Sequence, residues 1–103
     1  MSIRDFLRRL FIYEEAPGYV YLMRSNGLYK IGRSKRHPKN RLNDFVTGNP
    51  SIELVHYIRC SNMNQVEKEL HRKYANKRVY RGKRKTEWFR LTSKDIRYIK
   101  GIR

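Results

Sequence analysis

The chain of 103 residues is long enough for one small domain with a modest core, and chains of this size rarely form two. The sequence has 25 lysines and arginines against 9 acidic residues, a formal net charge of +16. The excess positive side chains repel one another in the folded state. This excess indicates a polyanionic partner, with nucleic acid as the first candidate and an anionic membrane surface or an acidic protein as the second. The single cysteine, Cys60, excludes a disulfide within these residues and a zinc site built on cysteines.

The sequence shows neither a membrane segment nor a secretion signal. No apolar run approaches the roughly 20 residues that span a bilayer, and no secretory signal pattern precedes the domain. A lone cysteine is compatible with a reducing compartment. We therefore expect an intracellular protein of the cytoplasm or nucleoid that is not secreted.

Residues 2–12 predict an amphipathic helix, within an N-terminal segment at 1–16 ahead of a domain at 17–103. Apolar side chains at i, i+3, i+4, i+7 and i+8 form one stripe. These side chains are Ile3, Phe6, Leu7, Leu10 and Phe11. The helix either docks on the domain's own sheet or presents residues 3–11 to a protein partner. Acidic residues at 5, 14 and 15 count against an organelle-targeting role.

Two short runs rich in β-branched and aromatic residues, within 18–33, flank Ser25-Asn26-Gly27. Asn-Gly between such runs predicts a β-hairpin, because both residues tolerate positive φ. Strand alternation places Tyr21 and Lys30 on one face and Tyr29 on the other, where we expect Tyr29 to pack. The second strand runs directly into a basic segment at 33–43 that contains five lysines and arginines, His37 and no acid before position 44.

Pro38 predicts the first turn of a short helix that carries Arg41, Leu42 and Phe45. Residues 52–60 predict a further strand, with Ile52, Leu54, His56, Ile58 and Cys60 on one side. We expect His56 to make a local hydrogen bond rather than to bind metal.

A longer helix is predicted from about Asn62 to Asn76, with a core stripe of Met63, Val66, Leu70 and Tyr74. The same template requires an apolar residue at 67, where the sequence has Glu67. Burying a carboxylate is costly unless it is paired or coordinates a cation. Glu67 is therefore either a boundary carboxylate paired with an arginine or a functional group, and His71 lies one turn further on.

Residues 77–85 carry six basic residues and predict an exposed loop. Residues 86–91 then predict a short strand, and Thr92 with Asp95 predicts the capped start of a closing helix. The order of elements indicates an α+β domain with an antiparallel or mixed sheet covered by helices.

Walker or Rossmann glycine loops and nucleophilic triads are absent from the sequence. The remaining chemistry suits metal-assisted phosphodiester hydrolysis. One carboxylate, Glu67, is sufficient to hold Mg²⁺, which keeps most of its waters and takes phosphate oxygens. Arg41 would add to charge stabilisation, and a tyrosine hydroxyl would position or deprotonate the attacking water.

Four segments together resemble the GIY-YIG endonuclease superfamily: Gly18-Tyr19-Val20-Tyr21, Tyr29-Lys30-Ile31-Gly32, Arg41, and the run from Glu67 to His71. Lys30-Ile31-Gly32 is similar to the phage-type branch of this superfamily, which has K-I-G in place of Y-I-G. Glu87-Trp88-Phe89 is similar to a later E-W-F run of the same branch. The resemblance implies an α/β domain with a central three-stranded antiparallel sheet and one-metal hydrolysis of DNA. It matches Tyr21 to the first motif tyrosine, Arg41 to the helical arginine and Glu67 to the metal ligand.

Lys30 departs from this pattern, because it stands where the second motif tyrosine is expected. It either orients a water or contacts the scissile phosphate, or the domain binds DNA without cutting it. The candidate catalytic residues are Tyr21, Lys30, Arg41, Glu67 and His71, with Mg²⁺ or Mn²⁺ at Glu67. The expected DNA-binding residues are Arg33, Lys35, Arg36, Lys39, Lys77, Arg78, Arg81, Lys83, Arg84 and Lys85. The alternatives are a non-catalytic nucleic-acid-binding module and a structural module of a larger nucleoprotein assembly.

Overall fold

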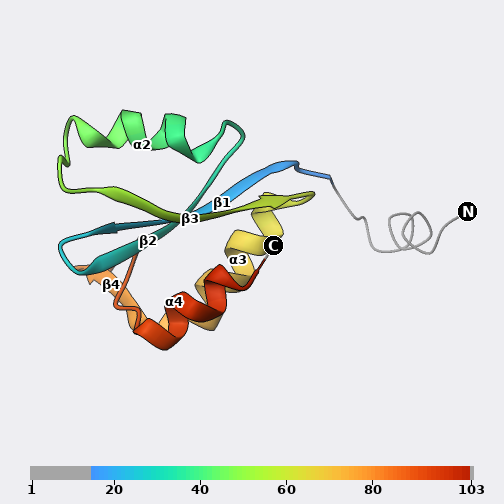
Figure 1. The fold of residues 1–103 in the computed structure, drawn as a ribbon. Helices are drawn as coiled ribbons and strands as arrows, with labels where there is room; N and C mark the ends of the chain where they lie inside the picture. Colours follow the sequence, from blue (N-terminus) through green and yellow to red (C-terminus); the bar gives the residue numbers. More distant parts are fainter. Residues whose placement is uncertain (1–14, 103) are drawn as a thin grey trace, which may run out of the picture.

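A computed structural model describes residues 15–102, and the N-terminal helix predicted at 2–12 lies outside the described residues. The described part is a small α+β domain in which a five-stranded antiparallel sheet is covered by three helices (Figure 1). The strands are β1 (Gly18–Ser25), β2 (Leu28–Ser34), β3 (Glu53–Cys60), β4 (Arg78–Arg81) and β5 (Arg84–Phe89). The helices are α2 (Pro38–Val46), α3 (Met63–Lys73) and α4 (Ser93–Lys100), with a short 3₁₀ turn at Ala75–Lys77.

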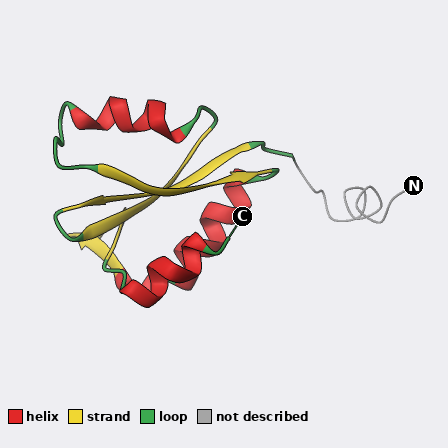
Figure 2. Ribbon diagram, in the orientation of Figure 1, coloured by secondary structure: helices red, strands yellow, loops and turns green. Residues whose placement is uncertain are grey.

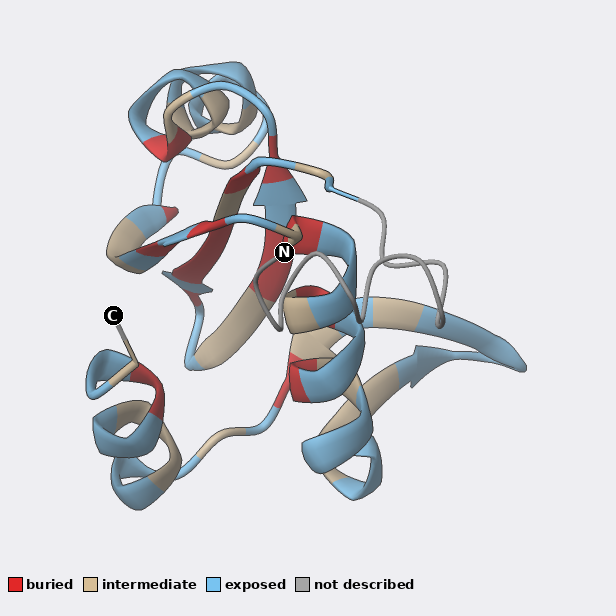
Figure 3. Ribbon diagram, turned by 90° about the vertical axis from the view of Figure 1, so that its right-hand side faces the viewer, coloured by how far each residue is buried: buried red, intermediate tan, exposed pale blue. Residues whose placement is uncertain are grey.

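The sheet has the order β3-β1-β2-β5-β4 and separates two apolar clusters. Helix α2 covers one face, and α3 and α4 cover the other (Figures 1 and 2). Tyr21 and Met23 pack under α2, whereas Val20, Leu22 and Ile31 pack with α3 and α4. Figure 3 shows that buried residues concentrate in the central strands and on the inner sides of the helices. Tyr29 packs against the α3–α4 cluster, which confirms the predicted alternation.

The β1–β2 hairpin forms as predicted. Asn26 and Gly27 have φ values of 53° and 76°, the pair of positive angles that a type I′ turn requires. This turn sets the register in which Met23 faces Lys30 and Tyr21 faces Gly32. Lys30 in the second motif and Tyr21 in the first motif therefore lie on the same face of adjacent strands.

The sheet has five strands, so the prediction of three is wrong, and residues 77–85 are largely exposed as predicted but do not form a loop. Residues 78–81 and 84–89 form the β4–β5 hairpin, which extends the sheet beyond β2 to five strands. Gly82, with φ of 63°, occupies the first central position of the turn, as in a type II′ hairpin. The strands carry charged residues on both sides, so no alternation of apolar and polar residues reveals them in the sequence.

The single-sided pattern predicted for 52–60 is also wrong. A register shift between Leu22 and Met23 makes Leu22 face His56 and Met23 face Leu54 across β1 and β3. The extra residue, Val55, is a β-bulge that switches the side on which the later side chains point. Ile52 and Leu54 therefore pack under α2, whereas Ile58 and Cys60 pack on the other face. The hydrogen bond of His56 is not the local one predicted, because its Nε2 lies 3.3 Å from the carbonyl of Ile102, 46 residues further along the chain.

The helix starts follow the predicted caps. Pro38 lies in the first turn of α2, the Asn62 side chain accepts from the Gln65 amide, and Thr92 with Asp95 forms a capping box on α4. Within residues 15–102, no helix is both long and apolar enough to cross a bilayer.

Candidate functional site

Tyr21 is buried under α2, and its ring crosses the neighbouring strand at Gly32. A Cβ at residue 32 would lie 2.5 Å from Tyr21 Cζ, so only glycine leaves room for the ring. Burial raises the pKa of the Tyr21 hydroxyl, and the charge of Glu87 raises it further, whereas the adjacent Arg41 guanidinium opposes both. The hydroxyl is therefore held as a neutral donor beside a cation.

Lys30 and Arg41 lie on the same side of the sheet as Tyr21 and share one aromatic ring. Lys30 Nζ lies 4.0 Å from the centroid of Phe45, and the Arg41 guanidinium carbon lies 4.6 Å from it. The Lys30 side chain is 16% exposed, and burial lowers the pKa of its ammonium group against the pull of Glu87, 3.8 Å away. The structure thus brings together three of the five predicted catalytic residues, Tyr21, Lys30 and Arg41.

Glu67 lies on α3, under the opposite face of the sheet, and its side chain is only 7% exposed. Arg33 Nη1 donates to Glu67 Oε1 at 2.6 Å, so the arginine pairing considered from the sequence is present. The other carboxylate oxygen, Oε2, is buried and has no hydrogen-bond partner among the described residues. One oxygen of Glu67 is therefore engaged and one is left without a partner.

Beyond Lys30, β2 has a neighbouring strand on one side only in the described part of the chain. β5 pairs with β2 only at Tyr29 and Lys30, so residues 31–34 of β2 are paired with β1 alone within 15–102. His71 Nε2 lies 2.8 Å from the Ile31 carbonyl, which can only accept, so Nε2 carries the proton. The charge of Glu67 also raises the pKa of Tyr21 and of Lys30, but less than burial, Glu87 or Arg41 changes either value.

A pocket of about 570 Å³ lies beside Glu67 and His71. Five cationic side chains from α3 and three strands line this pocket together with the carboxylate of Glu67. They are Arg33, Lys68, Arg72, Arg78 and Lys85. Of the predicted DNA-binding residues, Arg33, Arg78 and Lys85 meet in this pocket. We refer to these five cations and Glu67 as the basic pocket.

The other predicted DNA-binding residues lie elsewhere. Lys35 and Lys39 are exposed near the start of α2, and Arg36 is paired with Asp44 at 2.8 Å. Arg81, Lys83 and Arg84 are exposed at the tip of the β4–β5 hairpin. Lys77 Nζ lies 2.5 Å from Asp95, so its charge is already compensated.

Sequence reasoning missed Lys68, Arg72 and Glu87. Lys68 and Arg72 are four residues apart on α3, as are Glu67 and His71. A spacing of four places the members of each pair next to one another on the helix surface. The spacing was a usable signal. Glu87 gave none, because only the pairing of β5 with β2 brings it to Lys30.

The chain matches the model of the T5orf172 domain over residues 18–101. No curated protein and no solved structure matches the chain. The matched family is distinct from the GIY-YIG superfamily, so the assignment expected from the short motifs is wrong. Those motifs are each a few residues long and do not discriminate between families. The chain belongs to the T5orf172 domain family, which indicates a nucleic-acid-binding or nuclease-like module.

Proposed function

We propose that this protein binds DNA and hydrolyses its phosphodiester bonds as an endonuclease that depends on one divalent ion, Mg²⁺ or Mn²⁺. The observation that carries this proposal is the basic pocket, where five cations line the same cavity as a buried carboxylate, one oxygen of which has no partner among the described residues. Cations at this density attract a phosphate backbone. They do not explain why a carboxylate, which repels phosphate, is buried among them.

A divalent ion accounts for that carboxylate. Within residues 15–102 no three metal-ligating side chains cluster, so a cage built from protein ligands alone is not offered there. Mg²⁺ is commonly held by one or two carboxylates, with water and substrate phosphate completing its shell. Glu67 fits this mode through Oε2, which has no other partner among the described residues. A bound ion would neutralise charge developing on the phosphate.

The remaining residues take roles that follow from their surroundings. Arg41 and the cations of the basic pocket bind and orient the phosphate. Tyr21, with its raised pKa, stays protonated and positions a water by hydrogen bonding. Lys30, whose ammonium group lies beside Glu87 and Phe45, orients that water as a cationic hydrogen-bond donor. His71 holds the open edge of β2 in place through the Ile31 carbonyl.

A cleavage assay with a matched pair of variants tests the proposal. Purified protein is incubated with single-stranded, duplex and branched DNA in Mg²⁺, Mn²⁺ or EDTA. Glu67→Gln keeps the size of the buried side chain and should reduce cleavage at least about 100-fold, since it removes the carboxylate, with DNA affinity retained. Glu69→Gln, on the exposed side of the same helix, should cleave as the wild type does.

Absence of metal-dependent cleavage by the wild type on every substrate would refute the endonuclease. Equal activity of Glu67→Gln and the wild type would refute the role of Glu67. Thermal unfolding of both variants shows whether any loss comes from misfolding.

A second candidate is a DNA-binding module without activity, alone or within a nucleoprotein assembly. The ion pair between Arg33 and Glu67 favours it, because it occupies one of the two carboxylate oxygens. This candidate gives binding that weakens steeply with salt and no cleavage in any metal.

A further inference from the structure

A second pocket, of about 420 Å³, lies on the α2 side of the sheet, and the function proposed above makes no use of it. The tip of the β1–β2 hairpin, the loop after α2 and the β4–β5 hairpin form its walls. Trp88 lines it and is the direct strand partner of Lys30. Residues directly opposite on antiparallel strands share a face, so this pocket opens next to the candidate catalytic lysine.

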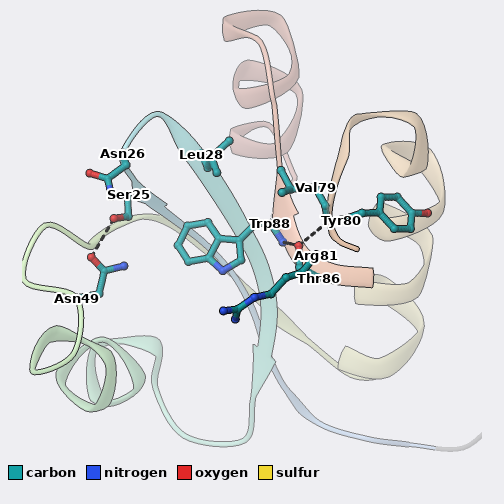
Figure 4. A pocket seen from close by; sticks show the side chains of 9 residues that line it. All are labelled: Ser25, Asn26, Leu28, Asn49, Val79, Tyr80, Arg81, Thr86 and Trp88. Atoms are coloured by element: carbon teal, nitrogen blue, oxygen red, sulfur yellow. Dashed lines mark hydrogen bonds between the residues drawn. The ribbon is translucent and has the colours of Figure 1, made fainter. Parts of the chain in front are cut away.

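Trp88 gives the pocket a flat aromatic surface. Figure 4 shows its indole lying across the middle of the pocket, with Leu28 and Val79 on the neighbouring strands. The ring of Tyr80 turns away from the pocket in the same view. A planar ligand that stacks on a single indole face matches this shape better than a bulky or branched one.

Asn49 directs hydrogen-bond donors toward the same space. Its Oδ1 lies 3.0 Å from the hydroxyls of both Ser25 and Ser51, so the oxygen end is already engaged. The amide nitrogen lies on the Trp88 side (Figure 4), where its two N–H groups have no partner among the described residues. Arg81 extends from β4 toward Trp88 and supplies a positive charge at the rim.

We propose that this pocket takes an unpaired base of the bound DNA. A nucleobase is planar, stacks on aromatic rings and carries acceptor atoms on its edge, and its own phosphates suit Arg81. A paired base does not fit this description, because its edge and both faces are occupied in the duplex. The inference rests on the proposed binding of DNA and specifies its target as DNA with an unpaired base next to the site.

Trp88 is the only tryptophan in the sequence, so its fluorescence reports on this pocket alone. The full chain is titrated with three labelled duplexes: fully paired, with one extra unpaired base, and with an abasic residue at that position. Label anisotropy measures binding, and tryptophan emission measures stacking. We expect roughly 5- to 100-fold tighter binding of the unpaired base than of the abasic duplex, with quenching only by the former.

Asn49→Asp replaces the donors with acceptors and should remove most of this preference while leaving affinity for the abasic duplex within a few-fold. Asn43→Asp makes the same change on the exposed surface of α2 and should keep the preference. Equal affinity for the base and abasic duplexes, or binding without quenching, overturns the base pocket and leaves the proposed function standing. Lack of binding to all three duplexes overturns both.

Discussion

The ring of Tyr21 lies against the backbone of Gly32, where any larger residue would overlap it. Tyr21 reaches across β2 in this way, so its hydroxyl arrives beside Arg41 rather than stopping above β1. The position of the Tyr21 hydroxyl, a candidate catalytic group, therefore depends on the absence of a side chain at Gly32.

Gly32→Ala should therefore displace Tyr21. The added methyl group meets the ring rather than a flexible chain end, so we expect a loss of about 1–3 kcal/mol in the free energy of unfolding, measured with urea. We also expect a loss of DNA cleavage beyond that explained by unfolding. Gly48→Ala is the control, because a Cβ there meets nothing within 4 Å. If Gly32→Ala is as stable and active as Gly48→Ala, Tyr21 does not depend on this contact.

Local signals in the sequence predicted the local structure. Asn26-Gly27 predicted the first hairpin because both residues accept positive φ, and Thr92 with Asp95 predicted the start of α4 through reciprocal hydrogen bonds. Glu67 drew attention because it interrupts an apolar stripe, and it is buried in the structure. Its function is still a proposal.

Features that depend on contacts between distant segments were not predicted. The β4–β5 hairpin lacks apolar alternation, so its charged residues resembled a loop. The basic pocket combines Arg33, Lys68, Arg78 and Lys85 from four elements, and only the sheet order brings them together. The bulge at Val55 likewise depends on pairing between β1 and β3, which no residue pattern within β3 reveals.

Removing Arg33 alone should lower the free energy of unfolding more than changing both members of the ion pair between Arg33 and Glu67. Arg33→Ala leaves a buried carboxylate uncompensated, a change that costs about 3–5 kcal/mol for a fully buried pair. Arg33 is 49% exposed and solvent screens the charge, so we expect about 1–3 kcal/mol. Adding Glu67→Gln should recover much of this loss, because the amide is neutral.

Urea unfolding of the two single variants and the double variant gives the coupling energy between these residues. Additive losses would mean that the two side chains do not stabilise each other in solution.

The basic pocket predicts a measurable count of phosphate contacts. Lys85→Ala and Arg78→Ala should each weaken DNA binding for all sequences alike and reduce the slope of log affinity against log salt by about 1. Arg59→Ala is the control, since Arg59 lies on β3 at the opposite edge of the sheet. Anisotropy titrations between 50 and 200 mM salt, roughly the range over which such contacts are lost, give the slopes. An unchanged slope in both pocket variants would place the DNA elsewhere.

The buried ammonium group of Lys30 should lower the free energy of unfolding at neutral pH, and this loss should disappear at high pH. Burial lowers the pKa of this ammonium group below the ordinary lysine value of 10.5. Between the folded and unfolded pKa values the unfolded chain holds more protons, so the contribution of Lys30 to stability rises with pH in that window. Below it, the folded state carries the full penalty of a desolvated charge. Lys30→Met removes the charge and its contact with the Phe45 ring, keeps an unbranched side chain at the same place and should be more stable than the wild type at pH 7.

The difference in the free energy of unfolding between the wild type and Lys30→Met should shrink as the pH approaches 10.5. Comparing the two proteins at each pH cancels the titration of the other residues. Urea unfolding at neutral and alkaline pH measures it. The same variant should lose DNA cleavage while gaining stability, a combination that simple unfolding cannot produce. A Lys30→Met protein that is less stable at pH 7 would show that the contacts of Lys30 with Glu87 and Phe45 outweigh its desolvation.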